Sequence, residues 1–295
     1  MIKKGYFTRF GLYLVLFLAT HLVQAQLKGK VVDEKNQPIP YVNIGVQNEA
    51  MGTTSEEDGT FYLPLKETKN LVFSALGYEK RVVKSDAAHT VQLQSTTYTL
   101  HEITVLNKKE TRVMETGSGE GIAQAFESGP KMDARFFSYN SKIKKHRYIK
   151  RVSLFTESNL EEATVKLHFY TVTPEGLPGE EMVAKDLLFQ VKKGSRKTYF
   201  DVSKYNLSFP KEGLFVAVER LFIEKNKYTK EVATSEVGKT KTLTVYYPLL
   251  FYNYTVKEYS YTFYGGSWHK EYKPSKDSSV PTRIFEPAIS LILTN

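Results

Sequence analysis

The chain has 295 residues, a formal net charge of +9 and no cysteine. The absence of cysteine excludes disulfides, thiol catalysis, thiolate metal sites and a lipid-modified cysteine, and a chain this long can bury ordinary cores without disulfides. Tyr, Phe, Val and Thr are abundant, and apolar residues alternate with polar ones over many short runs. This pattern is typical of β-strands, so we expect an all-β protein with two domains.

The N-terminal stretch has the pattern of a cleavable secretory signal. Three basic residues precede an apolar stretch at 10–23, and Val23 and Ala25 occupy the two positions that a signal peptidase reads. The apolar stretch is shorter than the roughly 20 residues that span a bilayer, which disfavours the alternative of a membrane anchor. We therefore expect residues 1–25 to be a signal peptide, an exported mature chain that starts at Gln26, and no transmembrane span in that mature chain.

Residues 26–106 carry the pattern of a first β domain. Short apolar runs alternate with turns rich in Gly, Pro and Asn, as in "LKGKVV", "YVNIGV", "TFYLPL", "NLVFSAL", "HTVQLQ" and "HEITVL". Runs of this length and spacing predict six or seven strands. We expect them to form a small antiparallel sandwich.

An acidic stretch at 52–61, "GTTSEEDGTF", lies between two of these predicted strands. Asp58-Gly59 between alternating runs is a strong hairpin signal, because both residue types tolerate positive φ. A calcium loop of the EF-hand type would need acidic side chains at alternate positions, whereas Glu56, Glu57 and Asp58 are consecutive and diverge. We therefore expect a hairpin turn here rather than a cation site.

The first domain resembles the carboxypeptidase regulatory-like domain, a transthyretin-like β-sandwich common in envelope proteins of Bacteroidota. The resemblance rests on a set of glycines, turn residues and strand positions: Gly29, Pro40, Val42, Ile44, Gly52-Thr53, Asp58-Gly59-Thr60-Phe61 and Gly77-Tyr78. It implies a folding and docking module without catalytic residues of its own. It also implies a partner among envelope or outer-membrane proteins, and a periplasmic or cell-surface protein peripherally associated with the outer membrane.

Two larger protein classes that carry this domain do not fit the rest of the chain. The segment "LHEITVLNKK" resembles the lead into the plug of TonB-dependent receptors, but only about 185 residues follow it, too few for a plug and a barrel of 22 strands. Metallocarboxypeptidases also carry the domain, yet none of the six histidines belongs to a His-x-x-Glu or His-Glu-x-x-His pair. We expect neither a receptor nor a zinc peptidase.

A second β domain is predicted after a charged, glycine-containing linker at 107–120. Within residues 121–295, "ATVKLHFYTV" alternates cleanly, with Lys166 and His168 on the face opposite the apolar residues, and "GLFVAVERLFI" is apolar on both faces, as in a central strand. We expect a larger jelly-roll-like β-sandwich. More loosely, residues 170–221 resemble an uncharacterised β-sandwich module of similar envelope proteins, which implies no known activity.

A basic stretch at 142–151, "KIKKHRYIKR", is a candidate contact with an anionic surface. Lys144, Lys145 and Arg147 could bind an anionic glycan or a membrane surface. Nucleic acid is disfavoured as a partner because the chain is expected to be exported. The alternative is a solvated strand edge protected by its charges.

An aromatic stretch at 246–272 is a further candidate for ligand binding. Eight tyrosines and the only tryptophan lie between 246 and 272. Sugar rings pack on aromatic faces while their hydroxyls form hydrogen bonds at the rim. Tyr264, Trp268 and Tyr272 flank the predicted loop at Gly265-Gly266, so we regard them as candidate ligand-binding residues; the alternative is that aromatic residues simply fill a sheet.

No catalytic constellation, metal set or cofactor motif is found in the sequence. "GSGEG" at 117–121 lacks the buried strand that a phosphate-binding loop follows, and no Gly-x-Ser-x-Gly elbow or acid and base pair is evident. We therefore expect a non-enzymatic, exported binding or scaffold protein of the bacterial cell envelope that docks through its first domain. The alternative is a carbohydrate-binding protein that uses the aromatic loop, with a polysaccharide as its partner.

The signal-peptide interpretation can be tested directly. Expressed in a bacterium that exports it, the mature protein is expected to start at Gln26, and N-terminal sequencing combined with intact mass measures this. Retention of residues 1–25 in the exported protein would contradict the interpretation.

Overall fold

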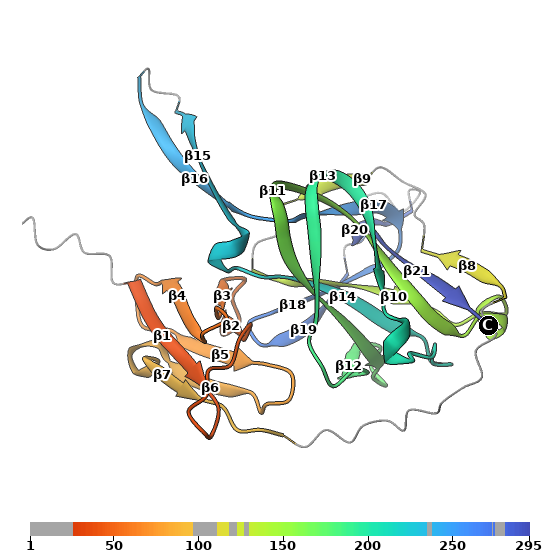
Figure 1. Cartoon of the computed structure of the whole chain (residues 1–295), viewed down its shortest axis with the longest axis horizontal. Helices are drawn as coiled ribbons and strands as arrows, with labels where there is room; N and C mark the ends of the chain where they lie inside the picture. The colour runs from red at the N-terminus through yellow and green to blue at the C-terminus, as the bar shows by residue number, and fades with distance from the viewer. Residues whose placement is uncertain are drawn as a thin grey trace, which may run out of the picture.

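The computed structural model describes residues 26–96, 111–117, 123–126, 130–234, 238–272, 274 and 281–295. The expected signal peptide, the expected strand at 101–106 and the parts of the expected linker at 107–110 and 118–120 lie outside these residues. The described residues form two β domains that lie side by side, the first in red to orange and the second in yellow to blue (Figure 1).

The N-terminal domain consists of two small sheets of strand order β4-β1-β7 and β3-β2-β5-β6. Its strands are β1 (Gln26–Val32), β2 (Asn43–Val46), β3 (Gly52–Thr54), β4 (Thr60–Pro64), β5 (Asn70–Ser74), β6 (Arg81–Lys84) and β7 (Thr90–Gln92). All pairs are antiparallel except β1 with β7, which is parallel, a departure from the purely antiparallel sandwich expected.

The alternation read in the sequence positions the core of this domain. Apolar residues on the inner faces are buried between the sheets, and Phe61 packs edge-on against Phe73 with ring centroids 5.6 Å apart. Because successive residues point to opposite faces of a strand, Tyr62 between Phe61 and Leu63 is 51% exposed. The predicted β-sandwich is thus confirmed for this domain.

The acidic stretch at 52–61 forms a turn, but not the expected hairpin. Asp58 accepts hydrogen bonds from the backbone N–H and the hydroxyl of Thr60, and Gly59 has a φ of +77°. However, β3 pairs with β2 while β4 pairs with β1, in the other sheet. The local Asp-Gly signal predicts the turn correctly; the partner of each strand is set by the sandwich, so the segment is a corner between sheets.

The C-terminal domain contains the remaining strands of the described residues. They are β8 (Val113–Thr116), β9 (Ala123–Phe126), β10 (Met132–Phe137), β11 (Tyr148–Val172), β12 (Pro178–Glu181), β13 (Leu187–Asp201), β14 (Leu214–Arg220), β15 (Lys227–Ala233), β16 (Thr240–Tyr246), β17 (Leu249–Val256), β18 (Tyr259–Tyr264), β19 (Ser267–Tyr272), β20 (Arg283–Pro287) and β21 (Ile289–Thr294). A large sheet has the order β19-β18-β10-β14-β11-β17-β20, and β15 pairs with β16 in a hairpin that projects from the body (Figure 1).

The 25-residue strand β11 links the parts of this domain. It pairs with β13 from Arg151 to Leu167, and the register shifts between Ser158 and Glu162. On its other edge, the first half pairs with β21 and the second half with β14. The paired strands β11 and β13 therefore extend over both layers around the main core. Strand β8, inside the range expected as linker, pairs with the outer edge of β21.

Strand β14 confirms the expectation of a central strand. All seven of its residues are buried, and it lies between β10 and β11. Its faces contact two separate apolar clusters, one containing Val216 and the other Phe215. The described residues are thus all-β, as predicted, and none of their helices is long and apolar enough to cross a membrane.

Candidate functional site

The candidate site lies where the N-terminal domain meets the second half of β11. Lys166 and His168 alternate with the core residues Val165 and Leu167, so their side chains lie on the opposite face of the strand. Lys166 is directly opposite Glu219 of β14. All three charged side chains are at least 90% buried, because the N-terminal domain covers this face.

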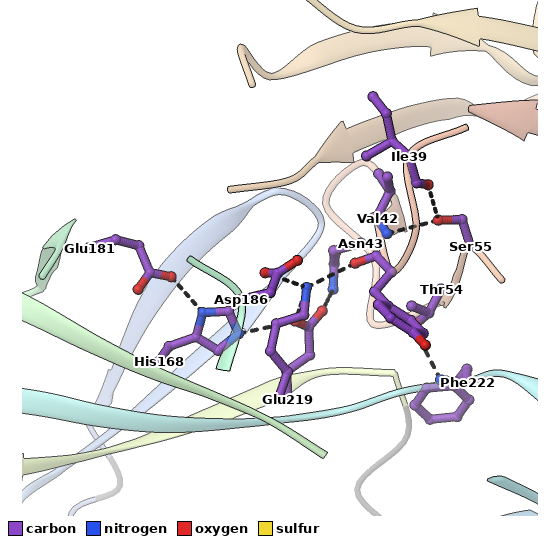
Figure 2. A network of polar contacts seen from close by, with 12 residues as sticks. Ile39, Val42, Asn43, Thr54, Ser55, His168, Glu181, Asp186, Glu219 and Phe222 are labelled. Atoms are coloured by element: carbon purple, nitrogen blue, oxygen red, sulfur yellow. Dashed lines mark hydrogen bonds and ion pairs between the residues drawn. The ribbon is translucent and has the colours of Figure 1, made fainter. Parts of the chain in front are cut away.

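A continuous polar network joins the two domains at this point (Figure 2). The Nζ atom of Lys166 donates to the carbonyl of Tyr41, 2.9 Å away, and lies 3.3 Å from the Asp186 carboxylate and 3.5 Å from that of Glu219. Asn43 donates through its side-chain amide to Glu219 over 2.9 Å. The network is therefore completed by two residues of the N-terminal domain.

His168 connects this network to a second carboxylate. Its Nε2 atom lies 3.1 Å from Oε2 of Glu219, and its Nδ1 atom contacts Oε1 of Glu181. Its ring stacks in parallel on Tyr170 with centroids 5.6 Å apart. A doubly protonated ring donates to both carboxylates, which fixes the imidazole in this orientation.

The charges in the network are set by their neighbours. Burial opposes a charged imidazole, but the carboxylates of Glu181 and Glu219 outweigh it and raise the pKa of His168 to about 9. Burial likewise opposes the Glu219 carboxylate, yet Lys166, His168 and Asn43 lower its pKa to about 2. At neutral pH His168 is therefore protonated and Glu219 is ionised, and the site is stable only while these paired groups remain together.

The acidic corner of the N-terminal domain supplies further contacts between the domains. Thr54 accepts a hydrogen bond from the backbone N–H of Phe222 over 3.1 Å, and Glu56 accepts one from the backbone N–H of Glu224 over 2.8 Å. Tyr41 packs with Leu221 and Ile223 in a small buried cluster. The stretch at 52–61 thus serves domain docking.

The turn between β18 and β19 also lies against the N-terminal domain. Gly265 and Gly266 have positive φ values of 59° and 87°. A Cβ atom on Gly265 would lie 2.6 Å from the backbone nitrogen of Asn48, and one on Gly266 would lie 2.5 Å from Val72. The carbonyl of Gly266 accepts a hydrogen bond from Lys80 over 2.9 Å. Glycine is required here because two backbones approach closely.

A cavity of about 360 Å³ lies beside the network, between the domains. Tyr78 and Lys80 line it from the N-terminal side, and Lys166, His168 and Trp268 from the C-terminal side. Domain interfaces are common places for ligand pockets. Lys166 and His168, two of the cations that border this cavity, already face carboxylates of the network, so their charges are compensated.

The structure does not bring the three aromatic candidate residues to one surface. Trp268 lies directly opposite Phe263 in the β18–β19 register, lines the interdomain cavity and packs edge-on against Tyr170 with centroids 5.4 Å apart. Tyr272 follows on the same face and is 55% exposed, with its ring 5.4 Å from that of Tyr259. Tyr264 is on the opposite face, where it stacks on His269 at 3.9 Å.

The basic candidate residues are at the surface. Lys144 and Lys145 belong to a short 3-10 helix (Ile143–Lys145), Arg147 follows it, and all three are exposed. The expected alternative of a protected strand edge does not hold, because β11 starts at Tyr148 and is paired on both edges by Arg151.

The residues of the network were not identified as a site in the sequence. The alternation of "ATVKLHFYTV" indicates only that Lys166 and His168 lie on the side opposite the apolar residues. One signal was present: Glu219 and Arg220 lie in an otherwise apolar run predicted to be a central strand. A charged residue in a fully buried strand needs a partner, which indicates a buried ion pair. Among the described residues, no group of three or more His, Asp or Glu side chains is placed to hold a metal ion.

Comparison with known proteins identifies the N-terminal domain. Residues 27–109 match the family model of the CarboxypepD_reg-like domain, which confirms the resemblance seen in the sequence. The chain is also similar to the TonB-dependent receptor SusC of Bacteroides thetaiotaomicron, with 30% identity over 124 residues. This similarity covers 40% of the chain and 12% of the receptor, so the chain spans only a small part of that relative's length.

The raised pKa of His168 predicts a pH dependence of stability. Below pH 6.5 the folded and unfolded states both hold the proton, and the stabilisation is fully present. Between pH 6.5 and about 9 only the folded state holds it, so the free energy of unfolding falls with pH, by up to roughly 3 kcal/mol. Urea unfolding at a series of pH values measures this.

The His168→Gln variant is the matched control, because its side chain does not titrate and the decline between pH 6.5 and 9 should be absent. For Glu219, whose pKa is lowered, stabilisation is present above pH 4.5 and is lost as the pH falls toward 2. A stability that stays constant or rises between pH 6.5 and 9 would contradict the described network.

The close contact between Gly265 and the backbone of Asn48 predicts that a larger residue at position 265 separates the two domains. Gly265→Val adds a side chain where even a Cβ atom would clash with Asn48, so we expect undocking and a larger radius of gyration in small-angle X-ray scattering. Gly238→Val is the matched control: Gly238 also has a positive φ, of 78°, but no contact surrounds its Cβ position. Equal scattering curves for the two variants would argue against docking through this turn.

Proposed function

We propose that this chain is an exported, non-enzymatic binding or scaffold protein of the bacterial cell envelope, whose first domain docks onto an outer-membrane protein. The observation that carries the proposal is the match of residues 27–109 to the CarboxypepD_reg-like domain. Similarity to the TonB-dependent receptor SusC of Bacteroides thetaiotaomicron supports the location. The family match concerns the N-terminal part of the chain.

The interdomain network supports a structural role for its ionisable side chains, which are of the types that also serve in acid-base catalysis. Lys166, His168 and Glu219 are buried, Glu219 contacts both Lys166 and His168, and each of the three also contacts a further side chain or carbonyl of the same site. Removing one partner from a buried ion pair lowers the stability of a protein by about 3–5 kcal/mol, so paired groups of this kind strongly favour the one arrangement in which they meet. We infer that the network fixes the orientation in which the first domain is presented.

With one side of the first domain occupied by the second, its sheet edges are the surfaces that we propose for docking. Strands β4 and β6 are terminal strands of their sheets. Tyr62 on β4 is 51% exposed and Val82 on β6 is 53% exposed. An edge strand with exposed apolar side chains can add a strand from a partner, with backbone hydrogen bonds for affinity and side chains for specificity.

Photo-crosslinking in intact cells tests this proposal. A photoreactive amino acid is placed at Val82 of the full chain, expressed in the source bacterium, and adducts are identified by mass spectrometry. We expect the protein in the envelope fraction and one outer-membrane protein crosslinked at Val82. The matched control is Val113 on β8 of the second domain, which is 63% exposed and should give no such adduct.

Recovery of the protein in the cytoplasm, or the absence of an envelope adduct at both Val82 and Tyr62, would overturn the proposal. A charge-bearing Val82→Glu variant distinguishes specific docking from proximity. If the partner is held by the first domain, the Val82→Glu variant should also abolish the adduct formed from Tyr62. If that adduct arises from proximity alone, it should remain.

A further inference from the structure

A second cavity, of about 450 Å³, lies within the C-terminal domain, on the opposite face of the sheet from the interdomain cavity. Met132 and Phe263 line the interdomain cavity, whereas their chain neighbours Asp133 and Thr262 line the second one. Successive residues of a strand point to opposite faces, so the sheet of β10, β18 and β19 separates the two cavities. This second cavity belongs neither to the network nor to the proposed docking edges.

The inner wall of the second cavity is polar. Asp133 is 8% exposed and accepts hydrogen bonds from the hydroxyls of Tyr252, over 2.5 Å, and Thr262, over 2.8 Å. The ammonium group of Lys131 lies 3.9 Å from the same carboxylate. A carboxylate offers about four lone-pair sites, and these neighbours hold it in a fixed orientation toward the cavity.

The outer wall is aromatic. Tyr254 of β17 lies directly opposite Phe285 of β20, and their ring centroids are 4.9 Å apart at an angle of 36°. The two residues remain 38% and 45% exposed. The guanidinium of Arg283 lies 5.8 Å from the Tyr254 ring. An exposed aromatic pair bordered by polar groups marks a binding surface rather than a core.

We propose that this cavity binds a neutral saccharide. The C–H face of a sugar ring packs on aromatic rings such as Tyr254 and Phe285, while its hydroxyls form hydrogen bonds with carboxylate, hydroxyl and guanidinium groups. The cations Lys131 and Arg283 balance the carboxylates Asp133 and Glu271, which favours an uncharged ligand. The volume falls within the range of about 300–1,000 Å³ that is usual for ligand pockets.

The polar inner wall distinguishes this ligand from an apolar peptide. Asp133 and Thr262 are hydrogen-bonded to each other, but the Asp133 carboxylate keeps acceptor sites beyond those that Thr262 and Tyr252 fill, and the aliphatic or aromatic side chain of a peptide has no group to donate to them. A polyhydroxylated ring supplies those donors. The site differs from the aromatic loop at 264–272 that the sequence pointed to, because neither Trp268 nor Tyr272 lines it.

Binding is tested with purified mature protein, residues 26–295, in native gels that contain dextran, xylan, galactomannan or, as an anionic comparison, chondroitin sulfate. We expect at least one neutral polysaccharide to retard the protein. The combined Tyr254→Ala and Phe285→Ala variant should lose at least ten-fold in affinity. Because both side chains are partly exposed, this variant should keep the thermal unfolding temperature of the parent chain within a few degrees.

The matched control is Tyr272→Ala, which removes a more exposed tyrosine, 55% against 38% for Tyr254, from outside the cavity and should bind like the parent chain. Thr262→Val, which removes one polar group from the inner wall at constant shape, should weaken binding without affecting the aromatic pair. The inference is overturned if none of the neutral polysaccharides retards the protein, if only chondroitin sulfate does, or if the Tyr272 variant loses binding while the Tyr254 and Phe285 variant retains it. The assay contains no partner protein, so its outcome is independent of the proposed envelope docking.

Discussion

The structure depends most on one physical constraint: three ionisable groups on β11 and β14 are buried, and only the presence of the other domain makes this possible. Lys166 and Glu219 face each other across two central strands, and residues of the N-terminal domain complete their hydrogen bonds. Buried charges are tolerated only when they are paired and hydrogen-bonded. The position of the first domain is therefore specified by polar chemistry as well as by apolar contact, which gives a single register of docking.

Local patterns in the sequence predicted the strands well, because alternation and turn residues act over short distances. The core of the first sandwich, the central strand β14 and the turn at Asp58-Gly59 all follow from such signals. The local signal did not show whether the strands on either side of that turn pair with each other; they do not, because β3 and β4 belong to different sheets. That choice is made by packing between segments far apart in the chain, which a local motif does not record.

The candidate site was less accessible to sequence reasoning for the same reason. A polar face of an alternating strand is usually exposed to solvent, and nothing near His168 in the sequence indicates that a second domain covers it. The aromatic residues show a similar limit: their abundance indicated a ligand surface, but the strand register places Trp268 in the interdomain cavity. Tyr254 and Phe285, 31 positions apart, become neighbours only through the pairing of β17 with β20.

Trp268 is the chain's only tryptophan, and it sits at the boundary between the domains, edge-on to Tyr170 and Phe263. Its indole therefore provides an intrinsic optical probe in the place where the two domains meet. Emission excited at the red edge of protein absorbance arises from this single position and reports the polarity and hydration of the interface. The molecule thus carries its own label for following domain association, and no dye or engineered chromophore is needed.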